Sequence, residues 1–127
     1  MFFFSCKAVA ADIFVGKDIN NAEWYVSGKI RNSNYGKLVW ITIINSPESS
    51  GVRVCSSCYG GKAYYPPKSK VQYAVDCNGN AAQVANIRYR EDGSVYSIDE
   101  TVYRFSSIPP DSMLEVIESK VCGTVKQ

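Results

Sequence analysis

The sequence predicts a single α+β domain: an antiparallel sheet of five to six strands with one C-terminal helix packed on it. Short runs rich in Val, Ile, Tyr and Trp recur along most of the chain, and Asn, Gly, Asp or Pro bounds each run. Tight-turn sequences join several of these runs, and one helical pattern follows them. The length of 127 residues suits one domain rather than two.

The first half of the chain contains three predicted strands. DIFVGK at 12–17 and EWYVS at 23–27 flank an Asp-Ile-Asn-Asn turn, so we expect a hairpin. The polar, Asn-rich residues 28–36 are expected to form a loop. KLVWITIIN at 37–45 is apolar on both faces, which indicates a central strand covered on both sides. Trp40 is therefore expected in the core rather than as a ligand platform.

The second half contains a predicted hairpin and a short last strand. VQYAVDC at 71–77 alternates between apolar and polar residues, and AAQVANIRYR at 81–90 returns after Asn78-Gly79. This dipeptide predicts a type I′ turn, whose two central residues both need positive φ. A second tight turn, Glu-Asp-Gly, precedes a strand at 94–97.

An irregular excursion and a helix complete the predicted elements. Residues 46–67 contain a Gly pair and a Pro pair and no helical period, so we expect a loop with a short ribbon at 52–54. Ser112 and Glu115 predict a capping box, in which the carboxylate returns to the N–H of the cap residue itself. Gly123 suits the left-handed C-terminal cap.

Composition disfavours several classes of function. The chain lacks histidine, the commonest general base and metal ligand. The net charge of +2 is spread along the chain, unlike the clustered charge of a nucleic-acid-binding protein. The chain contains no run of 18 apolar residues, so it has no predicted transmembrane helix. We therefore expect a non-enzymatic protein with no cofactor, no metal, no nucleic-acid partner and no transmembrane segment.

Cysteine content and the first residues favour export. Five cysteines in a chain of this length are typical of an exported domain. Residues 1–11 read MFFFSCKAVAA, and their Ala-Val-Ala has the form of a signal-peptidase site, so we expect the end of a signal peptide there and one mature domain over 12–127. Two alternatives are a lipidated Cys6 and an unstructured leader. Removal of 1–11 would leave four cysteines.

An ordered set of short segments supports a family resemblance. The segments are AADIFVG, Trp24-Tyr25, KLVWITI, Tyr73 with Asp76-Cys77, YREDGSV at 89–95, IPPDS at 108–112 and a helix ending in Val121-Cys122. From Asp12 to Cys122 the chain thus resembles the surface-adhesin protein E family, small exported proteins of Gram-negative bacteria. The segment around Cys55 and Cys58 departs from that family, and Pro110-Asp111 stands where Pro-Gly is expected.

The resemblance implies a compartment, a disulfide and a class of partner. It places the protein in the periplasm or on the outer cell surface, with a disulfide between Cys77 and Cys122 and a tendency to form a homodimer. It implies binding to host extracellular-matrix or serum proteins. Two free thiols at Cys77 and Cys122 remain the alternative. A disulfide between Cys55 and Cys58, a thiol-redox site, free thiols and a zinc site of all four cysteines are open for the other pair.

The candidate binding residues are expected to form one aromatic and basic loop, in and just after the irregular excursion. Tyrosine and lysine together suit contacts with proteins or glycans. The alternative is a tyrosine cluster packed on the sheet with solvated lysines. We therefore expect an adhesin-like binding protein that uses this loop and the sheet edges, with a periplasmic inhibitor or accessory subunit and a thiol-redox protein as alternatives. The candidates are Tyr59, Lys62, Tyr64, Tyr65, Lys68 and Lys70.

Overall fold

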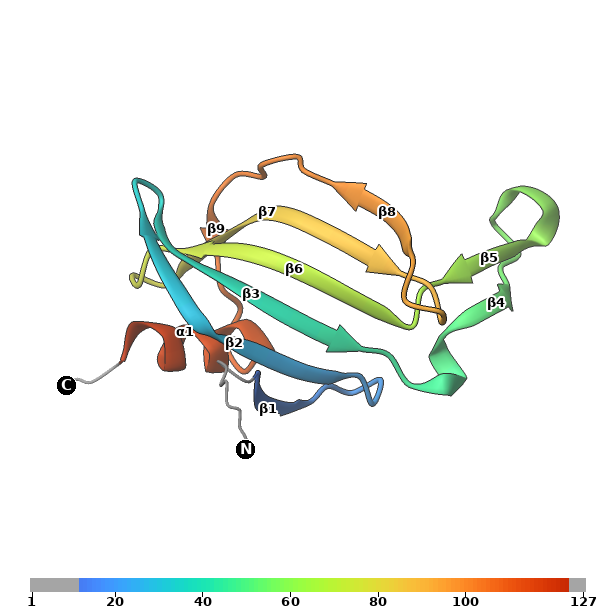
Figure 1. The fold of residues 1–127 in the computed structure, drawn as a ribbon, viewed down its shortest axis with the longest axis horizontal. Helices are drawn as coiled ribbons and strands as arrows, with labels where there is room; N and C mark the ends of the chain where they lie inside the picture. The colour runs from blue at the N-terminus through green and yellow to red at the C-terminus, as the bar shows by residue number, and fades with distance from the viewer. Residues whose placement is uncertain (1–11, 124–127) are drawn as a thin grey trace, which may run out of the picture.

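One antiparallel sheet dominates the fold, as Figure 1 shows. The computed structural model describes residues 12–123, so the expected signal peptide at 1–11, Cys6 included, lies outside the described residues. The elements are β1 (Ile13–Lys17), β2 (Glu23–Ser33), β3 (Gly36–Ile44), β4 (Gly51–Val54), β5 (Lys62–Tyr65), β6 (Lys68–Val75), β7 (Asn80–Tyr89), β8 (Val95–Asp99), β9 (Ser106–Ser107) and α1 (Met113–Cys122), with 3-10 turns at Pro47–Ser49 and Tyr59–Gly61.

The strand order confirms the predicted fold class. Six strands run in the order β1-β2-β3-β6-β7-β8, and the short β9 pairs with β7 as a seventh strand. All of these pairings are antiparallel. β4 and β5 form a separate two-stranded ribbon. The C-terminal helix α1 contacts the β1, β2 and β3 side of the sheet.

β2 is longer than the sequence predicts. Residues 28–36, expected to form a loop, instead continue β2 as far as Ser33, where a tight turn leads into β3. Ile30 pairs with Val39 and Arg31 with Leu38. The polar composition misled the prediction because strand pairing uses backbone groups, and this part of β2 is exposed to solvent.

The hydrophobic core lies between α1 and one face of the sheet. Ile117 of α1 and Val39 and Ile41 of β3 are completely buried in one cluster. Successive residues of a strand face opposite sides of a sheet, so Leu38 and Trp40 face away from α1. The cluster also contains Val26, Val75, Ala81 and Val121.

Among the residues that the structure describes, no helix or strand covers the opposite face of the sheet. In Figure 1 α1 lies behind β2, and no described element lies on the near side of the sheet. Among residues 12–123, β3 is therefore covered on the α1 side only, whereas the sequence predicts cover on both sides. Trp40 is half-buried on this open face, with Gln72 as its cross-strand neighbour in β6. We call this side of the sheet, away from α1, the open face.

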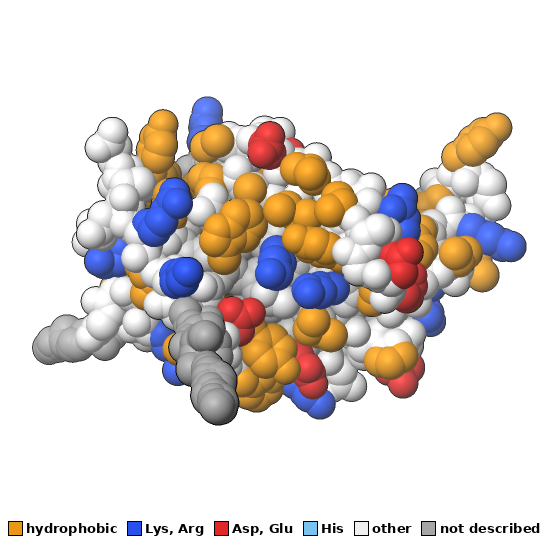
Figure 2. Space-filling model, in the orientation of Figure 1, with side chains coloured by type: hydrophobic (Ala, Val, Ile, Leu, Met, Phe, Trp, Pro, Cys, Tyr) orange, Lys and Arg blue, Asp and Glu red, His pale blue; other side chains and the backbone are white. Residues whose placement is uncertain are grey.

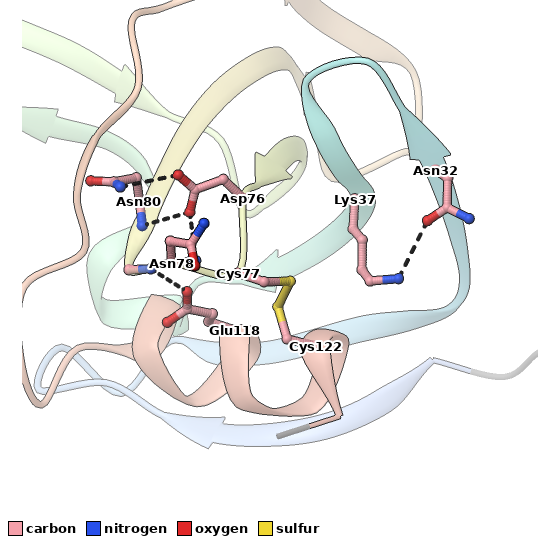
Figure 3. Close-up of a disulfide and its surroundings, with 9 residues drawn as sticks. Asn32, Lys37, Asp76, Cys77, Asn78, Asn80, Glu118 and Cys122 are labelled. Carbon is pink, nitrogen blue, oxygen red and sulfur yellow. Dashed lines mark hydrogen bonds between the residues drawn. A yellow bond between two sulfur atoms is a disulfide. The ribbon is translucent and has the colours of Figure 1, made fainter. Parts of the chain in front are cut away.

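The β6–β7 turn differs from the predicted type I′ turn. Positive φ falls on Cys77 (63°) and Gly79 (90°), not on both residues of the Asn-Gly pair. Four residues rather than two connect β6 to β7. The carboxylate of Asp76 closes this longer turn by accepting hydrogen bonds from the backbone N–H groups of Asn78 (2.7 Å) and Asn80 (3.1 Å), as Figure 3 shows.

Side chains cap α1 at its start and glycine ends it. The Oγ of Ser112 accepts a hydrogen bond from the backbone N–H of Glu115 at 3.3 Å, as predicted. The Glu115 carboxylate accepts from the N–H of Asp111 at 3.0 Å, one residue earlier than a capping box requires. The backbone of Asp111 is left-handed, with a φ of 61°, so the conformation before the helix differs from that of a capping box. Gly123, with a φ of 70°, forms the left-handed C-terminal cap.

Candidate binding surfaces

A two-stranded ribbon projects beyond the main sheet, at the right of Figure 1. Its strands β4 and β5 are antiparallel, and the disulfide between Cys55 and Cys58 closes the loop at its tip. We call residues 51–65 the arm. The sequence predicts only a short ribbon within an irregular loop here, because four-residue strands carry little periodic signal.

Contacts at its base hold the arm against the sheet. Tyr64 Oη donates a hydrogen bond to Glu91 Oε1 at 2.8 Å, and its ring centroid lies 4.9 Å from that of Tyr96. Desolvation and this hydrogen bond raise the pKa of Tyr64 above its ordinary value of 10.0. Asn45 donates from its backbone and its side chain to the carbonyls of the two prolines after the arm, at 2.8 Å each.

One side of the arm and its tip expose apolar side chains. Val52 lies opposite Tyr64 and Val54 opposite Lys62, so these four residues share one side of the ribbon. Val52 is 69% exposed and Val54 is 85% exposed. Tyr59, next to the disulfide, is fully exposed. Apolar groups gathered on a protein surface mark interaction sites, so the arm is a candidate binding surface.

The predicted binding residues do not form a single loop. Tyr59, Lys62, Tyr64 and Tyr65 lie in the arm, whereas Lys68 and Lys70 lie in β6. The Lys68 ammonium lies 5.3 Å from the ring centroid of Tyr89, in a cation–π contact. The expectation of one aromatic and basic loop is therefore wrong. Its physical reason is that β6 begins at residue 68 rather than 71 and carries both lysines into the sheet.

Two adjoining hollows lie on the open face, one on each side of Trp40. One hollow, of about 240 Å³, is lined by Asp12, Ser27, Trp40, Thr42, Lys70 and Ile87. The other, of about 220 Å³, is lined by Ser27, Lys29, Arg31, Leu38, Trp40 and Gln72. Figure 2 views this face and shows lysine and arginine side chains set among apolar ones. Sequence reasoning missed this surface because it assigned Trp40 to the core and 28–36 to a loop.

Both expected disulfides are present, one in the arm and one at the far end of the main sheet. The bond between Cys55 and Cys58 closes the arm, and the bond between Cys77 and Cys122 joins the β6–β7 turn to the end of α1 (Figure 3). This pairing contradicts a zinc site of all four cysteines and contradicts free thiols. An α-helix N-terminus beside the cysteines is one feature that favours a thiol-redox site, and only a three-residue 3-10 turn follows Cys58.

The aspartates of the turns serve as hydrogen-bond acceptors. Desolvation raises the pKa of Asp18 and Asp76, but hydrogen bonds from backbone and side-chain N–H groups outweigh it, so both values lie below 3.8. The Ser94 hydroxyl lowers the pKa of Asp92 in the same direction. Within residues 12–123, no three Cys, Asp or Glu side chains are grouped closely enough to hold a metal ion. Over the same residues, no helix is both long enough and apolar enough to span a membrane.

The chain was compared with protein-family models, with curated proteins and with solved structures. None of the three comparisons finds a match. The resemblance to the surface-adhesin protein E family therefore stays a prediction from the residues. The arm and the open face are the features from which a function is inferred.

Proposed function

We propose that this protein is an exported, non-enzymatic, adhesin-like binding protein that holds a protein partner with its arm. One observation carries the proposal: Val52, Val54 and Tyr59 are exposed on a ribbon that is fixed at its base and closed by a disulfide at its tip. A ribbon ordered in advance loses little conformational entropy on binding, so more of its apolar contact area contributes to affinity.

Export is supported by the cysteine chemistry. Disulfides persist in oxidising compartments, and two of them within the described chain fit a secreted or extracellular protein. The finer location, periplasm or outer surface of a Gram-negative bacterium, rests on the family resemblance. So does the partner class, host extracellular-matrix or serum proteins. A non-enzymatic role is supported by the sequence, which lacks histidine.

A periplasmic inhibitor or accessory subunit is the second candidate. The narrow tip closed by Cys55 and Cys58, with Tyr59 beside it, has the form of a loop that enters the cleft of an enzyme. Such a protein would form a tight stoichiometric complex with one enzyme. A thiol-redox role for the same pair is tested by insulin reduction in the presence of dithiothreitol, and an unchanged rate would exclude it.

Surface plasmon resonance against immobilised matrix and serum proteins tests the arm. We compare the wild type with the double variant Val54→Ser/Tyr59→Ser and with the control Val102→Ser, which removes a 63% exposed apolar side chain outside the arm. We expect the double variant to bind at least about tenfold more weakly and the control to bind like the wild type. Equal binding by all three would remove the arm from the proposal. Absence of binding to every matrix and serum protein would overturn the adhesin function.

A further inference from the structure

The two hollows on the open face form one groove that runs along β3. They share Ser27 and Trp40, so the indole of Trp40 stands between them. Asp12, Thr42 and Lys70 line the groove on one side of this indole, and Lys29, Arg31 and Gln72 line it on the other. We call this surface the Trp40 groove. It lies on the main sheet and contains no residue of the arm.

A bulge in β2 makes room for the groove. The pairing of β2 with β3 passes from Val26 opposite Ile41 to Ile30 opposite Val39. Three residues of β2, 27–29, therefore stand opposite Trp40 alone. A bulge redirects the side chains of its strand, and here Ser27 and Lys29 both line the space beside the indole.

The lining of the groove favours an anion. Lys29, Arg31 and Lys70 contribute three positive charges, and Asp12 contributes one negative charge. The Asp12 carboxylate already accepts a hydrogen bond from the Thr42 hydroxyl, at 3.3 Å. Charge-assisted hydrogen bonds from ammonium and guanidinium groups to carboxylates or sulfates are stronger than neutral ones. The net charge of the lining is therefore complementary to an acidic ligand.

The shape of the groove favours a linear ligand built of small polar rings. Two open hollows of similar size lie side by side, with a flat aromatic side chain between them and hydroxyl and amide groups around it. The face of a sheet offers side chains but no free backbone groups, so an extended peptide cannot add here as a further strand. Single-stranded nucleic acid stacks successive bases on several aromatic rings, whereas Trp40 is the one ring that these hollows place in the groove.

We propose that the Trp40 groove binds an acidic oligosaccharide, a chain of sugars that carry carboxylate or sulfate groups. One sugar ring packs its apolar face on the indole of Trp40. Lys70 on one side and Lys29 with Arg31 on the other bind the acidic groups of the neighbouring sugars. This site is independent of the arm, so it would serve a ligand different from the proposed protein partner.

Isothermal titration calorimetry with a heparin-derived hexasaccharide and with an oligogalacturonate tests the proposal and distinguishes sulfate from carboxylate. A neutral maltohexaose and a single-stranded DNA hexamer are the comparison ligands. We expect binding of at least one acidic oligosaccharide, weakened by salt, and no binding of maltohexaose. DNA binding as tight as that of the acidic sugars, or no binding of either sugar, would overturn the proposal.

Variants separate the groove from general electrostatic attraction. We expect Trp40→Ala to weaken binding by about tenfold or more, because the sugar loses its aromatic platform. Arg31→Gln/Lys70→Gln should weaken binding and reduce its dependence on salt, whereas Arg53→Gln/Lys62→Gln, the same charge change in the arm, should not. An equal effect of the two double variants would overturn the proposal. Thermal unfolding confirms that each variant is folded, and the Arg31/Lys70 pair remains a test if Trp40→Ala does not fold.

Discussion

The sulfur of Cys77 is bonded to that of Cys122, and this disulfide joins the β6–β7 turn to the last residue of α1. Beside it, Glu118 Oε2 accepts a hydrogen bond from the backbone N–H of Gly79 at 2.8 Å. The carbonyl of the same Gly79 accepts from the N–H of Ile108, also at 2.8 Å. One turn therefore holds both the helix and the segment that leads into it.

Removal of this disulfide should destabilise the protein more than removal of the disulfide in the arm. Cys77 and Cys122 are 45 residues apart, and the chain-entropy model gives about 4 kcal/mol for a loop of that size. Cys55 and Cys58 are three residues apart, for which the same model gives about 2 kcal/mol. Urea unfolding of Cys77→Ser/Cys122→Ser and Cys55→Ser/Cys58→Ser measures both losses. Equal losses would contradict the larger contribution expected of the disulfide between Cys77 and Cys122.

Gly36→Ala should be strongly destabilising. A Cβ at Gly36 would lie 2.5 Å from the carbonyl oxygen of Val75, a backbone atom that cannot move aside, and its φ of +127° suits glycine. Gly51→Ala is the matched control, since it has a φ of +87° and nothing within 4 Å of the added Cβ. We expect a loss of about 1 kcal/mol at the control and clearly more at Gly36, measured by urea unfolding. A loss at Gly36 no larger than the control's would show that β3 and β6 move apart here at little cost.

Stability should fall with acid, partly through Asp76. Hydrogen bonds lower its folded-state pKa below the ordinary 3.8, so near and below that pH the folded protein binds fewer protons than the unfolded chain. Its contribution is complete above the unfolded pKa and is lost as the pH falls through the folded pKa. In Asp76→Asn the amide oxygen still accepts hydrogen bonds but does not titrate, and we expect a loss of about 1 kcal/mol at pH 7 after allowance for solvent screening.

Chemical unfolding between pH 7 and pH 2 measures this contribution. The curves of unfolding free energy for the wild type and Asp76→Asn should converge as the pH falls, because protonated Asp76 no longer carries the charge that strengthens its hydrogen bonds. Parallel curves over the whole range would mean that Asp76 is not the titrating group.

Tyr64→Phe should loosen the arm without unfolding the sheet. The variant loses the hydrogen bond to Glu91 but keeps the ring that packs on Tyr96. We expect faster amide hydrogen exchange in β4 and β5 and unchanged exchange in β3 and β6. Tyr65→Phe is the control, because Tyr65 is on the other side of the ribbon and 42% exposed. Unchanged exchange in β4 and β5 of Tyr64→Phe would show that ring packing on Tyr96 and the hydrogen bonds of Asn45 fix the arm without the hydrogen bond to Glu91.

The local elements of this fold could be predicted from sequence, and the reasons are local. The Ser112 cap and the Gly123 cap act within one helical turn, and the alternation in 71–77 acts within one strand. The type I′ prediction at Asn78 was wrong because Asp76 closes a longer turn with its carboxylate. The hydrogen bonds of that carboxylate are local, but the Asn-Gly signal masked them.

The sequence by itself determined the α+β class, the single C-terminal helix and the residues available for disulfides. Only the tertiary structure decided which face of β3 is covered, because the faces of a strand are equivalent until a helix packs on one of them. It also decided that Lys29 and Lys70, far apart in the chain, both line the groove beside Trp40. Strand register sets such neighbours, and the alternation of side chains within one strand does not say which residues of another strand lie opposite them.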